Sequence, residues 1–350
     1  MYILLILLAF ILLSLSFFES HSISIEHSYL FKIRLATIKA FIGIAFFSYI
    51  ICETLSLFNL FSLNYVLISW VLINGIIIFL NKEKIKLNVF SVFSQKIIIP
   101  KKEKNILFLI FFLFILPLLL LAIFIPPNNW DSMAYHLPRV EHWIQNKNIY
   151  PYPTNIVRQV LTSPLSEYII ANFQILASTD SFSNLVQFAS FIFILFSATL
   201  IFSLLKIGIK GQLFLLLALL SLPMMLFQAT TTQTDLLASF FFVSFILFAL
   251  QIIQIVLIGY TGLGLPIVYY VFLVFNLVGL FLSLAVDIIA NRMAYKCPDN
   301  IKTINQLISE NKTNTSGNVL TDEETKYLKE NTDIFLNIYS YLFTFLYFKK

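Results

Sequence analysis

One window of this chain, residues 126–159, gathers side chains that could do chemistry. It reads PPNNWDSMAYHLPRVEHWIQNKNIYPYPTNIVRQ and holds Asp131, His136, Arg139 and Arg158 beside several aromatic residues. Carboxylates and imidazoles carry protons in general acid–base catalysis, and guanidinium groups bind phosphate oxygens through paired hydrogen bonds. The sequence on both sides is dominated by Leu, Ile and Phe, and charge is costly within lipid. We therefore expect the chemistry in a polar loop between membrane spans.

The composition predicts a membrane protein. Of the 350 residues, 59% are hydrophobic and 12% are charged, whereas a soluble domain carries roughly 25% charged residues. Cys52 and Cys297 stand far apart without a CxxC spacing, so they indicate neither a disulfide framework nor a metal site. The lysines behind the net charge of +5 cluster beside apolar runs, and we expect no nucleic-acid partner.

Several apolar runs approach or exceed the roughly 20 residues that cross a bilayer. We expect an all-α, polytopic helical membrane protein with about 8–9 transmembrane helices. The first run is interpreted as an uncleaved anchor, because it lacks a preceding positive charge and a small-residue cleavage site. The expected spans are 2–18, 40–61, 63–80, 105–125, 183–205, 212–228, 235–258 and 265–289, with a shorter candidate from Ile334 to Phe348.

These spans divide the chain into four regions. Residues 1–104 form N-terminal membrane helices with a Lys-rich cytoplasmic loop, and residues 105–258 form a membrane core that includes an external loop, 126–182. Residues 259–290 add a further membrane helix. Residues 291–350 form a polar tail with a short apolar C-terminal segment, and this tail is too polar to bury a core of its own.

Lysine and arginine positions orient the spans, because cytoplasmic loops carry an excess of them. Lysines between residues 81 and 104 mark one cytoplasmic loop. If the segment 164–178 does not cross, the loop that contains Asp131 and the turn before Asp235 both face outside. Two further basic groups then fall on the cytoplasmic side, namely Lys32, Arg34 and Lys39, and Lys206 and Lys210.

The Asp131 loop has a helical pattern. Met133, Leu137, Val140 and Ile144 form an apolar stripe, while the polar residues fall on another face. We expect an amphipathic juxtamembrane helix with its apolar side toward lipid and its polar side toward a cavity. Pro138 should kink or divide this helix.

The window 126–159 resembles the first external loop of large bacterial and archaeal membrane glycosyltransferases with the GT-C fold. These are similar to the protein mannosyltransferase and aminoarabinose transferase group, glycosyltransferase family 39. Further pieces that resemble the family are ICETLSLFN at 51–59, NLVQFASFIFILFSATLIFSLLKIG at 184–208 and TTTQTDLLASFFFVSFILFAL at 230–250. Members of this family are usually longer, and no family motif follows Gln251, so the chain is short or divergent at its C-terminus.

The resemblance implies a function and roles for these residues. The family transfers a sugar from a polyprenyl-phosphate carrier to a glycan, lipid or protein acceptor on the external face of the plasma membrane. Asp131 matches the acidic residue near the start of the family's first external loop, which makes it the candidate general base. We assign no cofactor and no metal ligand, and leave the need for a divalent metal open. The candidates for binding the donor or acceptor are Tyr135, His136, Arg139, Arg158, Glu167 and Asp235.

Each assignment has a structural alternative. Asp131 could cap the helix that starts at Ser132, since Asp is a favoured N-cap residue, and Asp235 could do the same for its span. Trp130 could belong to an interfacial aromatic belt instead of stacking on a sugar. For the whole chain, the alternative is a non-catalytic or degenerate membrane protein that acts as a scaffold or resembles a transporter.

Overall fold

A computed structural model describes residues 2–18, 28–94, 99–156 and 158–257, together with Val274 and Asn276. All of them belong to the first of the two units into which the chain divides, Met1–Ala290. Every regular element in these residues is a helix. Apart from Val274 and Asn276, the expected span 265–289 lies outside the described residues, as do the candidate from Ile334 to Phe348 and the expected tail.

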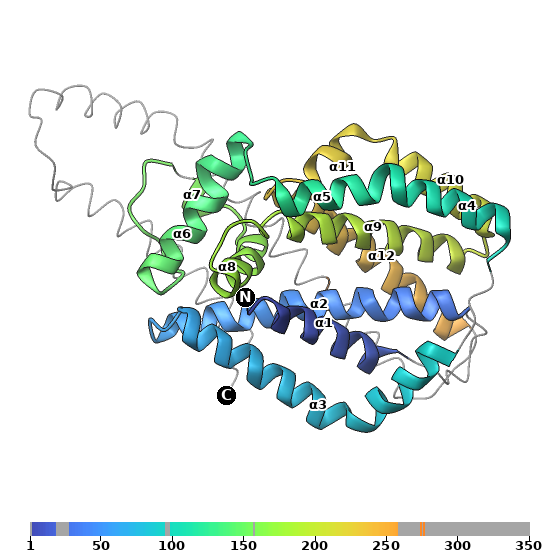
Figure 1. Cartoon of the computed structure of the whole chain (residues 1–350), viewed down its shortest axis with the longest axis horizontal. Helices are drawn as coiled ribbons and strands as arrows, with labels where there is room; N and C mark the ends of the chain where they lie inside the picture. The colour runs from blue at the N-terminus through green and yellow to red at the C-terminus, as the bar shows by residue number, and fades with distance from the viewer. Residues whose placement is uncertain are drawn as a thin grey trace, which may run out of the picture. The chain divides into compact units, whose positions relative to one another are not determined.

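The helices follow one another in the order drawn in Figure 1. The π-helical turn η1 joins α4 and α5 into one continuous helical stretch, 101–124, and a second π-helical turn, η2, opens α6. The elements are α1 (Leu4–Phe17), α2 (Tyr29–Leu57), α3 (Leu63–Ser94), α4 (Lys101–Ile110), η1 (Phe111–Ile115), α5 (Leu116–Phe124), η2 (Ser132–His136), α6 (Leu137–Asn146), α7 (Arg158–Leu161), α8 (Leu165–Ala177), α9 (Leu185–Leu204), α10 (Ile209–Leu220), α11 (Pro223–Gln228) and α12 (Asp235–Leu257).

Five of the described helical stretches are long and apolar enough to cross a membrane, namely α2, α3, 101–124, α9 and α12. Helices suit this environment because each satisfies its own backbone hydrogen bonds. The expected span 2–18 is a 14-residue helix, α1, and is shorter than these five. The expected span 212–228 is divided at Pro223, which lacks a backbone N–H, into α10 and α11.

The basic residues near the start of α2 lie within the helix and do not form the loop that the sequence predicted. The helix begins at Tyr29, well before residue 40, and its first turns contain Lys32, Arg34 and Lys39. Arg34 donates a hydrogen bond from Nη1 to Oγ1 of Thr199 over 2.8 Å, which ties α2 to α9. Much of the expected 81–104 loop is helical as well, because α3 continues to Ser94 and α4 starts at Lys101.

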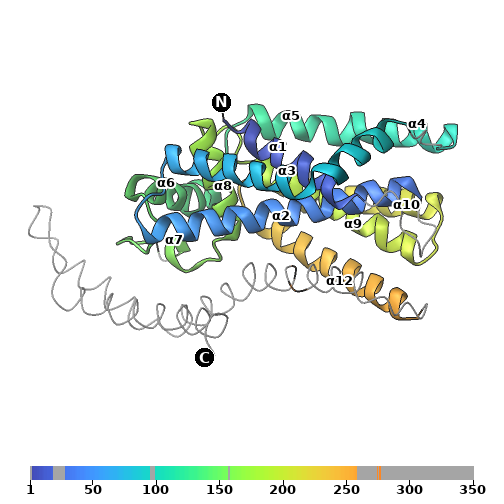
Figure 2. The ribbon, with the colours of Figure 1, turned by 90° about the horizontal axis from the view of Figure 1, so that it is seen from below.

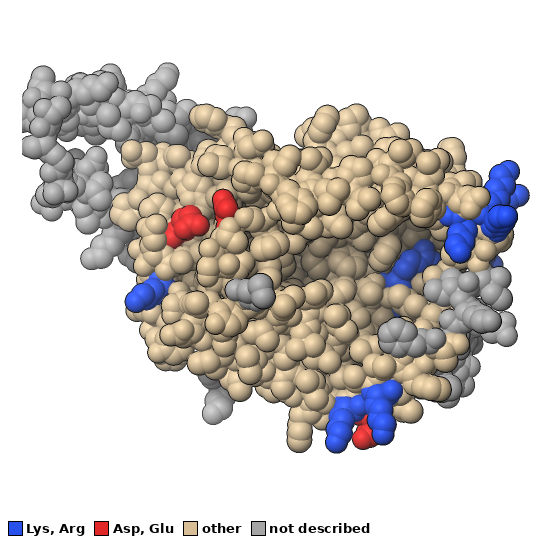
Figure 3. Space-filling model, in the orientation of Figure 1, with Lys and Arg blue, Asp and Glu red and all other residues tan. Residues whose placement is uncertain are grey.

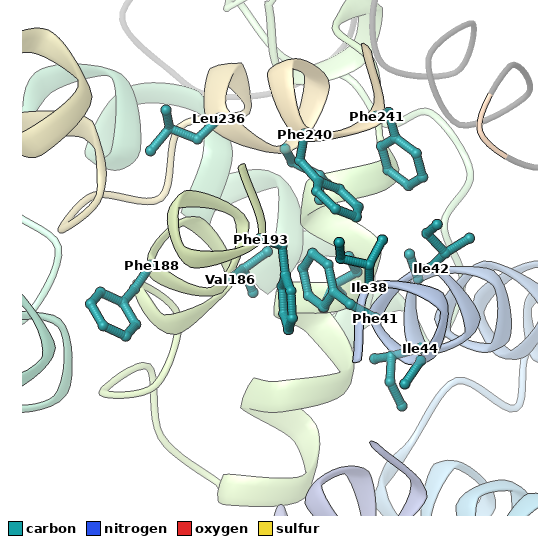
Figure 4. Packing of buried hydrophobic residues seen from close by; sticks show 14 of the residues in the cluster. Ile38, Phe41, Ile42, Ile44, Val186, Phe188, Phe193, Leu236, Phe240 and Phe241 are labelled. Atoms are coloured by element: carbon teal, nitrogen blue, oxygen red, sulfur yellow. The ribbon is translucent and has the colours of Figure 1, made fainter. Parts of the chain in front are cut away.

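The core is formed where α2, α9 and α12 meet (Figures 2 and 4). The ring of Phe41 from α2 stacks on Phe193 from α9 with centroids 4.6 Å apart. It also meets the edge of Phe240 from α12 at 5.1 Å. Such aromatic pairs contribute packing beyond simple area burial, so the three helices form a defined centre.

Two of the apolar stretches turn much of their surface outward. Within the most apolar window, only 22% of α3 and 11% of the stretch 101–124 is buried. Large side chains such as Phe79 and Phe112 are exposed. An apolar surface of this extent is typical of contact with lipid or a partner, which agrees with a membrane protein.

Helix α8 is short, at 13 residues, and largely buried. The indole Nε1 of Trp70 on α3 donates to Oδ1 of Asn172 over 2.9 Å. The amide of the same Asn172 lies 3.3 Å from Sγ of Cys52 on α2. These contacts fix α8 between two of the long helices, and α8 in turn supports the polar segments described next.

Candidate functional site

The helical segment that begins the polar window takes its form from Pro138. Leu137 donates its backbone N–H to Ser132 five residues earlier, which closes the π-helical turn η2. Pro138 has no N–H to offer the carbonyl of Ala134. The side chain of Gln159 supplies the missing donor, because its Nε2 donates to Ala134 O over 2.8 Å. The division of the expected helix into η2 and α6 therefore follows from one proline and is stabilised by a distant glutamine.

Asp131 does not cap this helix through its side chain. Instead, Oδ1 of Asn129 accepts the backbone N–H of Ser132 at 2.9 Å. The carboxylate of Asp131 is thus available for other partners. It accepts a hydrogen bond from Nε2 of Gln233 at 3.0 Å, and it lies 3.8 Å from Nη1 of Arg158.

The segment before α12 packs directly on η2. The backbone N–H of Thr232 donates to Oγ of Ser132 over 3.2 Å, and both residues are fully buried. Asp235, the first residue of α12, accepts a hydrogen bond from Nε2 of Gln228 at 2.7 Å. The amide of Leu237 is satisfied by Oε1 of Gln187 on α9. The structure therefore brings the two candidate acids to the same end of the helices.

Tyr135 lies among these charged groups. Its pKa is raised to about 12, first because the phenol is half-buried and then because the Asp131 carboxylate is nearby. The guanidinium of Arg158 partly offsets the rise, and its Cζ lies 5.7 Å from the centre of the Tyr135 ring. Glu167 and Asp235 raise the pKa further. Tyr135 is therefore the residue at which the expected site groups converge.

Three other expected site residues form a buried cluster. Nδ1 of His136 lies 2.7 Å from Oε1 of Glu167, and Nη1 of Arg139 lies 3.4 Å from the same oxygen. Arg139 also donates to the backbone carbonyls of Gln159 and Thr162. All three side chains are at most 3% exposed. The cluster ties η2 and α6 to α8.

Two opposing effects set the charge of Glu167. Burial raises the pKa of its carboxyl, but the His136 imidazole and the Arg139 guanidinium outweigh burial and hold the pKa below its ordinary value. Oε2 of the same carboxylate is buried without a hydrogen-bond partner among the described residues. Glu167 is therefore an anion enclosed by protein and held by its two neighbours.

The apolar stripe of this segment faces protein and not lipid, which corrects the sequence expectation. Leu137 and Val140 are 7% and 0% exposed, and α6 packs on α8. Only Met133, in the first turn, is exposed. The reason is that α8 presents an apolar surface of its own, which covers the stripe.

Basic residues gather mainly at the end of the helices opposite this site (Figure 3). The stretch 101–124 starts at Lys101 and ends six residues before Trp130. Helix α3 runs the other way and carries its lysines in its second half. In the sequence, the lysines near the ends of these helices are Lys82, Lys84 and Lys86 of α3, Lys101, Lys102 and Lys104 of α4, and Lys206 and Lys210 around the connection from α9 to α10.

Sequence reasoning missed Gln159 and Gln233, which hold Ala134 and Asp131. In the described part of the chain, no group of three or more His, Cys, Asp or Glu side chains is arranged to hold a metal. Asp131 and Asp235 could contribute carboxylate oxygens to a cation shared with a substrate.

Comparison of the chain with protein-family models, with curated proteins and with solved structures gave no match. The fold and the site together define a helical membrane protein with a polar, partly open site at one end of its helices. Its function is inferred from the residues of that site.

Proposed function

We propose that this protein is a membrane glycosyltransferase that moves a sugar from a polyprenyl-phosphate carrier to an acceptor on the extracytoplasmic face. The observation that carries the proposal is the placement of Asp131. Its carboxylate is partly exposed, is held by Gln233, and lies beside the exposed guanidinium of Arg158. A base and a phosphate-binding cation are thus available side by side.

In the proposed reaction, Asp131 takes the proton of an acceptor hydroxyl as that oxygen attacks the anomeric carbon of the donor. The bond between the anomeric carbon and the phosphate oxygen breaks, and the lipid phosphate leaves with the electron pair. Arg158 binds the leaving phosphate through its guanidinium fork. The product is the glycosylated acceptor with inverted configuration.

Arg158 suits this role better than Arg139. The Arg158 side chain is 69% exposed and its contact with Asp131 is long, at 3.8 Å. An exposed ion pair of this kind is worth at most about 1 kcal/mol, so a phosphate can displace it. Arg139 is buried and already bound to Glu167 and two carbonyl oxygens. We therefore assign the phosphate to Arg158 and a supporting role to Arg139.

The distribution of charge supports an extracytoplasmic site. Lysines at the opposite end of the helices mark the cytoplasmic side by the positive-inside rule. Asp131 and Asp235 then face the other side, where a carrier lipid would present its sugar. Under this proposal η2 and α6 form the juxtamembrane segment of the first external loop of a plasma membrane protein.

The proposal is tested by incubating the purified protein with a panel of polyprenyl-phosphate sugars and measuring release of the lipid phosphate. Turnover with at least one donor, lost in Asp131→Asn, is the expected result. A well-folded preparation that turns over none of the donors would favour a non-catalytic scaffold.

A further inference from the structure

An exposed aromatic side chain directly precedes one carboxylate of the site and the hydrogen-bond donor of the other. Trp130 directly precedes Asp131 and is 83% exposed. Phe227 directly precedes Gln228, which donates to Asp235, and is 70% exposed. Two segments that are far apart in sequence thus carry the same pairing of an acid with an outward aromatic ring.

Other exposed apolar side chains lie close to these rings in the chain, and the first of them are at the end of a membrane span. Phe124 and Ile125, at the end of α5, are 75% and 43% exposed. Met133, one turn after Trp130, is 57% exposed. On the other segment, Met224 of α11 is 64% exposed beside Phe227. Exposed apolar side chains therefore lie at the end of the stretch 101–124 and on both segments of the site, with the exposed Asn128 and the partly exposed Asn129 between Ile125 and Trp130.

Water is a poor environment for such a surface. Isolated exposed apolar residues are ordinary, but a contiguous group marks a contact with lipid or a partner. In the chain, the Trp130 segment directly follows a span whose apolar window is only 11% buried, which favours lipid. Tryptophan is enriched where bilayer and water meet, because its ring is apolar and its N–H is polar.

We propose that Trp130 and Phe227 lie in the headgroup layer of the bilayer and thereby hold Asp131 and Asp235 at the depth of the lipid phosphates. The two carboxylates and Arg158 then face the water side of that layer. This placement does not depend on glycosyl transfer, and it would be the same for any substrate that the site accepts.

The chain contains three tryptophans, and two of them, Trp70 and Trp143, are buried. The difference in emission between the wild type and Trp130→Phe therefore reports on Trp130. The full-length protein is placed in bilayers whose acyl chains carry bromine either close to the headgroup or close to the chain end, because bromine quenches tryptophan on contact. Phe227→Trp is measured in the Trp130→Phe background.

Leu72→Trp in the same background calibrates the depth, since Leu72 lies near the middle of the apolar part of α3, ten residues before Lys82, and is 59% exposed. Emission from this position should be lost most to bromine near the chain end. Emission from Trp130 and from Phe227→Trp should be lost most to bromine near the headgroup. Circular dichroism and the melting temperature confirm that each variant is folded.

Two results would overturn the placement. If Trp130 is quenched by aqueous iodide but by bromine at neither depth, it faces water or another protein. If Trp130 and Leu72→Trp share the same depth profile, the site lies within the hydrocarbon and not at its edge. Activity is not measured in this experiment, so its failure and that of the proposed glycosyl transfer are separate outcomes.

Discussion

The amide of Gln233 donates a hydrogen bond to the carboxylate of Asp131 over 3.0 Å, although 102 residues separate them. This contact joins the segment before α12 to the segment before η2. It leaves the second oxygen of Asp131 beside Arg158. Asp131, for which helix capping was the structural alternative, is thereby turned toward a charged, partly open site.

Asp131→Asn tests the general base. Asparagine keeps the size of the side chain and can still accept from Gln233, but it cannot take a proton from an acceptor. We expect lipid-phosphate release to fall by roughly two to four orders of magnitude, with little change in melting temperature. Asp180→Asn, at an exposed turn outside the site, is the matched control. Equal activity in both variants would move the base to Asp235.

The two arginines should respond differently to substitution. Arg158→Lys loses the bidentate fork, so donor affinity should fall while the melting temperature holds. Arg139→Ala leaves the buried carboxylate of Glu167 without one of its partners, and breaking a buried ion pair typically costs about 3–5 kcal/mol. Denaturant unfolding and donor titration separate these effects. Unchanged donor affinity in Arg158→Lys and Arg158→Ala would remove the phosphate from this residue.

Glu167 should make stability depend on pH. Because its pKa is lowered in the folded protein, its stabilising contribution is complete above the ordinary glutamate pKa of about 4.3 and is lost as pH falls through the lowered value. Glu167→Gln should therefore melt well below the wild type near neutral pH, and the difference should shrink on acidification. A difference in melting temperature that is constant from neutral to acidic pH would contradict this account.

Pro138 and Gln159 should be energetically coupled. Gln159→Met leaves the buried carbonyl of Ala134 without its donor, which typically costs about 1–3 kcal/mol. Pro138→Ala supplies a backbone N–H that can reach the same carbonyl. The double variant should therefore be more stable than the sum of the single effects predicts. Strict additivity would show that Gln159 acts through Tyr152 and Thr154, which also bond to it.

The topology can be tested with single cysteines in a background that lacks Cys52 and Cys297. Tyr150→Cys and Asp180→Cys should react with an impermeant thiol reagent from one side of the membrane. Lys84→Cys and Lys206→Cys should react only from the other, because the basic residues gather at the opposite end of the helices. Labelling of Asp180→Cys from the lysine side would mean that the two ends are not separated by the bilayer.

Some of this arrangement could be predicted from sequence. The composition indicated a helical membrane protein, and the length of the apolar runs located most of the long helices. The orientation of the α6 stripe could not be predicted, since lipid and protein interiors are equally apolar and select the same side chains. Leu137 and Val140 therefore looked suited to lipid, although they face α8.

Long-range hydrogen bonds were also beyond the sequence. Glu167 and His136 are 31 residues apart, and Gln159 and Ala134 are 25 apart. The partners of each pair lie in different helices, so no local pattern indicates the pairing. Asn129 could have been recognised as a cap, because it stands three residues before the amide it accepts, but the sequence analysis considered only Asp131 for this role, as the alternative to a general base.

The π-helical turn η2 also sets the rotational register of everything that follows it. A π-turn accommodates one residue more than an α-helical turn, and one residue corresponds to roughly 100° of rotation in an α-helix. The wide turn absorbs this extra residue, so deletion of a single residue between Ser132 and His136 would restore regular winding and leave α6 facing the same way. Regular α-helical winding of all five residues, in contrast, would rotate α6 by about that amount about its axis. Arg139 and Val140, which are buried, would then no longer face the protein interior. The width of this one turn therefore determines which face of α6 is buried.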